Sequence, residues 1–158
     1  MNIKEEFRLA LRELVYPVCV VSTYNDETKE NHAITVSSVT SLSFEPPSIL
    51  VCINKDSSIH SSLKKDSNFN ISFLSSSQTE ISNLCGTDEL SDKRFDNDFW
   101  DFKNNIGFIK NSQSVISCTI KEITNHGSHS VFFGDVVEVI KNGNTKPLLY
   151  GKGKYLDI

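Results

Sequence analysis

The fold class is decided by the stretch His32-Ala-Ile-Thr-Val-Ser-Ser-Val-Thr-Ser-Leu-Ser43 and by the apolar run Ser48-Ile-Leu-Val-Cys-Ile53, which follows Pro46 and Pro47. Isoleucine, valine and threonine give the first stretch a strong β propensity, although it also carries many hydroxyl groups. The two prolines break the chain before the second stretch, whose nearly continuous apolar character is typical of a strand buried on both faces. The pair therefore predicts two successive strands.

Further strand patterns lie on both sides of this pair. A β-branched run at Val18–Thr23 precedes a polar turn over residues 24–31 and predicts a hairpin with the first stretch. The remaining strand patterns, with turn signals at Asn125-His-Gly127 and Asn142-Gly143, are Phe69–Leu74, Val115–Thr124, Ser130–Ile140 and Lys146–Leu156.

Three short helices complete the predicted elements. Apolar residues recur at helical spacing over residues 3–15 and predict an amphipathic helix with Ile3, Phe7, Ala10, Leu11 and Leu14 on one side. Ser57 and Ser58 can cap a second helix through about Lys65. The third is Gln78–Cys85, preceded by a capping box of Ser77 and Glu80 and closed by Gly86, and an acidic, aromatic excursion at Thr87–Asn105 follows it.

These elements show no regular alternation of strand and helix along the chain. About seven strands against three short helices favour a mainly β fold, an antiparallel barrel with short capping helices. The length of 158 residues predicts one domain over residues 1–158.

Composition and charge exclude several classes of protein. Twenty acidic against sixteen basic residues give a net charge of −4, and no basic tract is present that could follow a nucleic-acid backbone. No apolar run approaches the length of a membrane span, and the polar, acidic start of the chain does not read as a signal peptide. We therefore expect a cytoplasmic protein with no nucleic-acid or membrane partner.

Cys19, Cys52, Cys85 and Cys118 lie at equal intervals, which raises the possibility of a repeat. Their flanking sequences do not repeat, so the spacing is interpreted as accidental. No CxxC pair is present for a metal knuckle, and a cytoplasmic chain keeps its thiols reduced. The three cysteines in strand patterns are expected to be buried free thiols.

The hydroxyl-rich stretch is the first candidate site. Strand alternation places Thr35, Ser37, Ser41 and Ser43 on one face, and Ser38 and Thr40 on the other. A polar but uncharged face can wrap a phosphate, because hydroxyl and backbone N–H groups donate to it while a nearby lysine adds charge. The alternative is a solvated edge strand with ordinary serines and threonines.

The second candidate site is Asn54-Lys-Asp-Ser-Ser-Ile-His60, which leaves a predicted strand and enters a predicted helix. Ser57 and Ser58 at a helix N-terminus, with Asn54 and Lys55 beside them, form a natural anion site. The alternative is plain helix capping with an exposed Lys55.

A third candidate is His126-Gly-Ser-His129. A turn or strand would not aim both imidazoles at one ion, and no third ligand is near in the sequence, so no metal is expected. The chain also has no P-loop, GxGxxG, HExxH or GxSxG motif.

Ten segments occur together in a recognisable order. They are Phe7-Arg-Leu-Ala-Leu11, Pro17-Val-Cys-Val-Val-Ser-Thr23, Thr35-Val-Ser-Ser-Val-Thr-Ser-Leu-Ser43, Glu45-Pro-Pro47, Val51-Cys-Ile-Asn-Lys-Asp-Ser-Ser-Ile-His60, Phe69–Leu74 with Gln78, Arg94-Phe95, Gly127-Ser-His129, Phe133-Gly-Asp-Val136, and Pro147-Leu-Leu-Tyr150 with Tyr155. This pattern covers nearly the whole chain and resembles the flavin reductase-like domain family, short-chain NAD(P)H:flavin oxidoreductases with an FMN-binding split barrel.

The resemblance implies a homodimeric barrel that binds FMN, or FAD in some members, and reduces it with NADH or NADPH. It also implies that such a reductase can supply reduced flavin to a separate monooxygenase. The family's flavin-lining segments carry over to Thr35, Val36, Ser37, Ser38, Asn54, Lys55, Ser57 and Ser58, and the histidine on the nicotinamide side becomes His129. The chain departs from the family in having His32-Ala33 where a glycine is usual and Ser128 where an acidic residue is usual.

The chemistry of such a reaction agrees with the residues present. Hydride transfer is carried by the cofactors, so no charged catalytic motif is required. Without GxGxxG, a nicotinamide nucleotide would have to bind in a shallow cleft over the flavin. Two alternatives stay open: a non-catalytic FMN-binding electron carrier or sensor, and a split barrel for another ligand, such as a haem-related or pyridoxal-type molecule.

Overall fold

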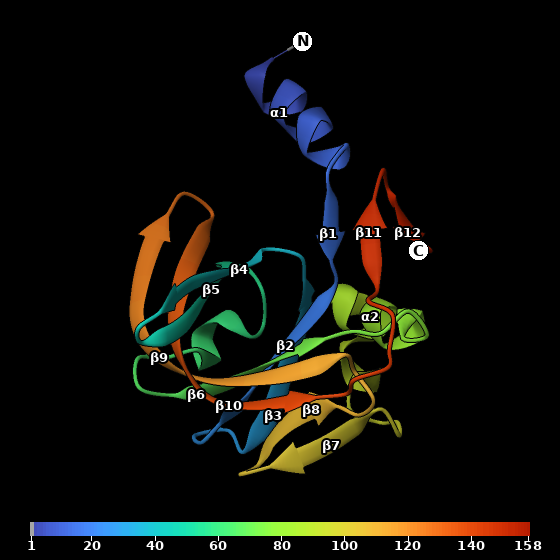
Figure 1. The fold of residues 1–158 in the computed structure, drawn as a ribbon. Helices are drawn as coiled ribbons and strands as arrows, with labels where there is room; N and C mark the ends of the chain where they lie inside the picture. Colours follow the sequence, from blue (N-terminus) through green and yellow to red (C-terminus); the bar gives the residue numbers. More distant parts are fainter. Residues whose placement is uncertain (1) are drawn as a thin grey trace.

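Seven antiparallel strands form the main sheet in the computed structural model, which describes residues 2–158 (Figure 1). Their order across the sheet is β3-β2-β6-β9-β10-β5-β4. Their bounds are β2 (Cys19–Asn25), β3 (Glu30–Val36), β4 (Val39–Phe44), β5 (Pro47–Asn54), β6 (Asn68–Phe73), β9 (Ser114–His126) and β10 (His129–Lys141). The predicted mainly β, antiparallel fold is confirmed.

The order of the strands requires the sheet to roll up. β3 and β4 are the two edges, yet only Ser37 and Ser38 separate them in the chain. Three peptide steps can span about 10 Å, whereas the edges of a flat sheet of this size would lie nearly 30 Å apart. The sheet therefore curls until its edges meet at one end, which is the geometry of a split barrel.

Two smaller sheets are attached to the barrel. β1 (Val15–Pro17), β11 (Leu149–Gly151) and β12 (Lys154–Leu156) form a three-stranded sheet, and β7 (Trp100–Lys103) pairs with β8 (Ile106–Ile109) as a hairpin. Helix α1 (Ile3–Arg12) extends from β1 away from the barrel (Figure 1). The other helical segments are α2 (Thr79–Gly86) and the 3-10 helices η1 (His60–Ser62) and η2 (Asp88–Lys93).

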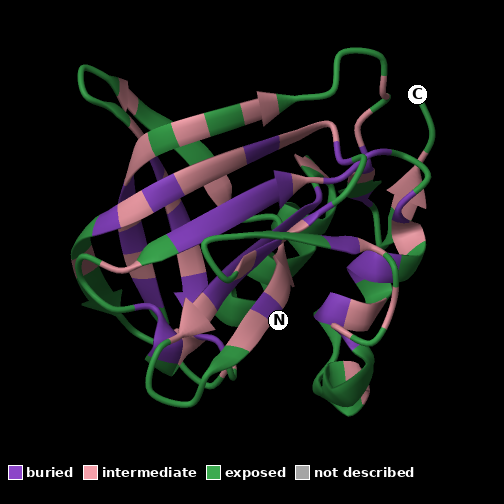
Figure 2. Ribbon diagram, turned by 90° about the horizontal axis from the view of Figure 1, so that it is seen from below, coloured by how far each residue is buried: buried purple, intermediate pink, exposed green. Residues whose placement is uncertain are grey.

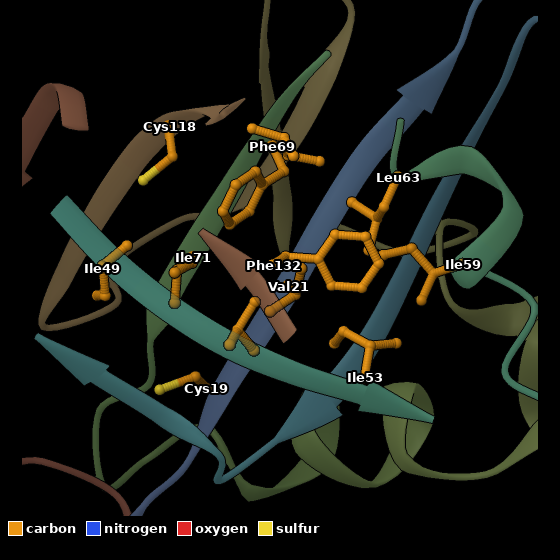
Figure 3. Packing of buried hydrophobic residues seen from close by; sticks show 12 residues of the cluster. Cys19, Val21, Ile49, Ile53, Ile59, Leu63, Phe69, Ile71, Cys118 and Phe132 are labelled. Carbon is orange, nitrogen blue, oxygen red and sulfur yellow. The ribbon is translucent and has the colours of Figure 1, made fainter. Parts of the chain in front are cut away.

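The interior holds two apolar clusters, and buried residues concentrate along the barrel strands (Figure 2). The first fills the barrel around Phe69, Ile71 and Phe132 (Figure 3). The second, which includes Trp100 and Leu148, packs with residues of α2 and of β8. The aromatic excursion is thus a structured part of the second cluster, as expected.

Three of the four free cysteines are fully buried. Cys19 and Cys118 lie in the barrel cluster and Cys85 in the second cluster, whereas Cys52 is half-buried. Burial raises the pKa of the three buried thiols to about 12. The prediction of buried free thiols is confirmed for Cys19 and Cys118.

Several local predictions are wrong, and the structure gives the reasons. Residues 32–43 are two strands, because the chain leaves one sheet edge and joins the other at Ser37 and Ser38, so the predicted common face of hydroxyls does not exist. The predicted strand Lys146–Leu156 is instead the β11–β12 hairpin over residues 149–156, because Gly153, at φ +79°, lies in the turn between the strands. The stretch Ser48–Ile53 was expected to be a strand buried on both faces. In β5 only the face toward the core is buried, and the residues on the other face are half-buried.

The helix predictions are only partly correct. The segment that follows Ser57 and Ser58 makes only the turn η1, with no side-chain cap. The helix α2 is present, but its N-cap is Gln78 and the expected Ser77–Glu80 capping box does not form. Instead, the Gln78 side chain accepts from the Ser75 N–H at 2.9 Å. Within residues 2–158, no helix has both the length and the apolar character needed to cross a membrane.

Candidate functional site

The two phosphate-site candidates meet at the seam of the barrel. The Ser38 carbonyl accepts from the Cys52 N–H at 3.2 Å, and the Ser38 hydroxyl donates to the Cys52 carbonyl at 2.7 Å. Asn54 lies two residues further along β5. The link between β3 and β4 is therefore next to the end of β5, as a shared site would require.

Several hydroxyl protons at the seam are already used by the protein. Besides Ser38, Thr35 donates to the Ser82 carbonyl at 2.6 Å, and Ser57 donates to the Asn54 carbonyl at 2.7 Å. A hydroxyl has one proton, so these groups can only accept from a ligand. Within the described residues, the hydroxyls of Ser37 and Ser58 make no hydrogen bond and remain free to donate.

A hollow of about 510 Å³, here called the main hollow, opens beside the seam. One wall is the end of β3 with Thr35, Val36 and Ser37, and the opposite walls come from the end of α2 and from the β11–β12 hairpin. Tyr155 stands in the hairpin wall: its hydroxyl donates to Asn83 Oδ1 at 2.8 Å and accepts from Ser82 Oγ at 2.8 Å. This volume lies in the range of small-molecule sites.

A smaller hollow of about 210 Å³, the small hollow, adjoins it and shares Gly86 as a wall. Asn54, Ser57 and Arg94 are among the residues that line it. The thiol of Cys85 also faces it, but burial raises the pKa of that thiol to about 12. Cys85 therefore stays protonated at neutral pH and is not a thiolate nucleophile.

Arg94 holds the wall that the two hollows share. Its side chain is 4% exposed, and its guanidinium donates to the carbonyls of Ala33 at 2.8 Å, Leu84 at 3.1 Å and Thr87 at 2.7 Å. These bonds tie β3 to the chain on both sides of Gly86. The carboxylate of Asp88 lies 3.5 Å from this guanidinium. Asp56 and Asp88 also line the small hollow, so the charge of Arg94 is offset there.

Four predicted residues lie beside the hollows without lining them, and one of these is Ser38, which is bonded to Cys52. Lys55 turns toward the β9–β10 hairpin, where its Nζ donates to the Gly127 carbonyl at 2.9 Å. His129 is the strand partner of Asn54 and is exposed, with its Nδ1 2.8 Å from Ser128 Oγ. Ser58 is exposed in the loop that follows Lys55.

Nine further residues that line the main hollow received no role from the sequence, among them Ser82, Asn83, Gly86, Tyr150 and Tyr155. Only the segments around them showed a recognisable sequence pattern. Gly86 ends a predicted helix, and both tyrosines belong to the C-terminal segment that contributes to the family resemblance. Their convergence depends on how α2 and the β11–β12 hairpin dock on β3.

Comparison with known proteins gives a consistent result. The sequence pattern described as the flavin reductase like domain matches residues 11–158. The chain is 30% identical over 155 residues, 98% of this chain and 87% of the relative, to the reductase component of an FADH(2)-dependent resorcinol hydroxylase from Rhizobium sp. (strain MTP-10005). It is 29% identical over 153 residues, 96% of this chain and 80% of the relative, to the FMN reductase (NADH) RutF of Pantoea ananatis (strain LMG 20103).

A solved structure shares the fold. The NADH:FAD oxidoreductase SgcE6 of Streptomyces globisporus C-1027, in complex with NAD and FAD fragments, aligns with a TM-score of 0.89 at 22% identity. The alignment covers 100% of this chain and 95% of that one.

Proposed function

The chain belongs to the flavin reductase-like domain family, and from this premise we propose that it transfers a hydride from a reduced nicotinamide nucleotide to FMN or FAD. The observation that carries the proposal is the pair of adjoining hollows at the barrel seam. The main hollow has the volume for a ring system and presents the free Ser37 hydroxyl to a phosphate. The small hollow beside it adds the polar side chains of Asn54 and Ser57, while its carboxylates, Asp56 and Asp88, offset the charge of Arg94.

The residues present suit a flavin. Flavin supplies the hydride-accepting chemistry when it is bound, so the protein has to hold the rings in place and exclude competing reactions. In this chain Val36 and Tyr155 line the part that would face the rings, while Ser37 presents a free hydroxyl.

Turnover with added flavin tests this proposal. Purified protein with FMN should oxidise NADH or NADPH faster than a control without protein, and the comparison of the two donors identifies the nicotinamide. A yellow protein that oxidises neither donor in steady state would instead be an FMN carrier or sensor. A chromophore that is not flavin after denaturation would indicate another ligand class.

We also propose that the reduced flavin leaves the protein for a separate monooxygenase. Support comes from the relative that is the reductase component of a hydroxylase. A protein with this role should release flavin readily, and a coupled oxygenase should therefore be active across a dialysis membrane.

Ser37→Ala should weaken FMN binding roughly 10- to 100-fold and leave riboflavin binding nearly unchanged. The Ser37 hydroxyl is free to donate, and a charge-assisted bond to phosphate contributes about 1.5–3 kcal/mol. Dissociation constants from flavin fluorescence measure both ligands. Ser38→Ala is the matched control, since its hydroxyl donates to the Cys52 carbonyl and should contribute much less. Equal losses for FMN and riboflavin would remove Ser37 from the phosphate site.

His129→Ala should lower kcat/KM for the nicotinamide nucleotide by about tenfold, the effect of one lost hydrogen bond, while FMN affinity stays near that of the wild type. Steady-state kinetics together with flavin titration separate these effects. His126→Ala, on the same exposed hairpin, is the control. If FMN affinity collapses and turnover per bound flavin is normal, His129 belongs to the flavin site.

We further propose that the protein is a homodimer joined through α1. None of the residues of this helix is buried, and Ile3 and Phe7 expose more than half of their surface along one side. Leu14, just beyond the helix, is 50% exposed. An apolar helix face of this kind is stable in water when another surface covers it.

Phe7→Glu should convert the dimer to monomer, because a carboxylate would then have to be desolvated in the interface. Molar mass from light scattering at several concentrations measures the change. Leu9→Glu, which introduces the same charge on the opposite side of the helix, should remain dimeric. A wild-type protein that is monomeric at every concentration would refute the dimer.

We propose a cytoplasmic location and one domain over residues 1–158. The four free cysteines support a reducing compartment, and the family pattern, which runs from residue 11 to the last residue, supports the single domain.

A further inference from the structure

A third hollow, of about 480 Å³, continues from the main hollow toward α1. The two hollows share Ser37, Tyr150 and Gly153 as lining residues. The remaining walls come from α1, β1 and the β11–β12 hairpin. One extended ligand could therefore occupy both hollows at once. We call the third one the basic hollow, because Arg8, Arg12 and Lys152 line it.

This concentration of positive charge contrasts with the net charge of −4 of the whole chain. Arg8 is paired with Glu5 on the same helix, and Lys152 Nζ lies 3.8 Å from Glu13. Arg12, in contrast, has no carboxylate within 4.0 Å among residues 2–158. The basic hollow therefore presents one cation without a counter-ion and is suited to an anion.

The position of Arg12 is built into the fold. Its carbonyl accepts from the Lys152 N–H at 2.8 Å, which joins the end of α1 to the β11–β12 turn. A Cβ at Gly153 would lie 2.7 Å from Arg12 Nη2. The absence of a side chain at residue 153 therefore leaves the space that the guanidinium occupies.

Two tyrosines add aromatic surface to this hollow. Tyr16 lines it from β1, and Tyr150 lies where it joins the main hollow, with its ring 5.3 Å from that of Tyr155. Partly exposed aromatic rings beside a cation are the usual platform for a purine base next to its phosphates.

We propose that the basic hollow binds the adenosine diphosphate half of a dinucleotide, with Arg12 at the pyrophosphate and the tyrosines against the adenine. The redox-active half would occupy the main hollow, so this inference rests on the proposed function. The same chemistry occurs in FAD and in nicotinamide adenine dinucleotide, and the test below distinguishes them.

The proposed dimer face borders this hollow. At about 100° per residue, Arg8 and Arg12 lie about 140° and 180° around α1 from Ile3. Leu11 and Leu14, on the predicted apolar side, also line the hollow, so its two arginines lie away from the face that would meet the partner and its two leucines lie beside that face.

Arg12→Gln tests the proposal through four dissociation constants, for FAD, FMN, NADH and reduced nicotinamide mononucleotide. Binding to FAD but not FMN, or to NADH but not the mononucleotide, should weaken about tenfold or more, the scale of one charge-assisted bond. The first result assigns the hollow to FAD, and the second assigns it to the nicotinamide dinucleotide. Arg12→Lys keeps the charge and should recover part of the affinity.

Lys4→Gln removes a cation from α1 outside the hollow and should change none of the four constants. The inference is overturned if Arg12→Gln leaves both dinucleotides unaffected, or if it weakens each dinucleotide and its mononucleotide equally. All four constants come from equilibrium titration without turnover. A protein that binds these ligands but does not reduce flavin would refute the proposed function and leave this test valid.

Discussion

Phe132→Ala should lower the free energy of unfolding by about 3–5 kcal/mol, the range for removing a buried aromatic ring. Phe132 lies on the central strand β10, is 1% exposed, and packs among Ile53, Ile59 and Leu63 (Figure 3). Its ring also meets His60 edge-on at 5.6 Å. No neighbour can fill the space, because strands enclose the cluster.

Urea denaturation of the ligand-free protein measures this loss. Phe44→Ala is the matched control, since Phe44 is 86% exposed and its truncation should change stability by less than about 0.5 kcal/mol. Similar losses for the two variants would mean that the barrel interior contributes no more to stability than the surface does.

Arg94→Met should lower the free energy of unfolding by about 3 kcal/mol or more and weaken flavin binding at the same time. The carbonyls of Ala33, Leu84 and Thr87 would lose their donor, and each unsatisfied buried polar group costs about 1–3 kcal/mol. The wall at Gly86 would then no longer be held against β3.

Urea denaturation and FMN titration together separate the two roles of Arg94. Arg94→Lys retains the charge but cannot reach all three carbonyls, so it should recover little of the stability and little of the flavin affinity. Arg8→Met, in an exposed ion pair, should leave unfolding almost unchanged. If Arg94→Met is unstable but binds FMN like the wild type, Arg94 supports the fold and does not position the site.

Local sequence patterns predict a strand well where one uninterrupted stretch of the sequence forms the whole strand. Apolar residues alternate with polar ones or run continuously in Phe69–Leu74 and Val115–Thr124, and the structure has strands there. The break at Ser37 and Ser38 is different, because β propensity is continuous across it. The break follows from closure of the sheet, which depends on pairing partners far away in the chain.

The candidate site was likewise only partly predictable from local sequence patterns. The hydroxyl-rich stretch and the stretch from Asn54 to Ser58 were found because their residue types suit a phosphate. The role of each hydroxyl was not predictable, since Ser38 and Ser57 use their protons on backbone carbonyls. The walls from α2 and the β11–β12 hairpin depend on tertiary docking, in which Arg94 and Thr35 bind carbonyls of a distant segment.

The short link through Ser37 and Ser38 also bears on solubility. An open sheet exposes two edge strands whose unpaired backbone groups can recruit other chains into aggregates. In this molecule the adjoining ends of both edges are drawn together, and Ser38 between them bonds to Cys52 of β5 through its carbonyl and its hydroxyl. The Ser38 carbonyl, which could otherwise pair with another chain, is thus already used within the molecule.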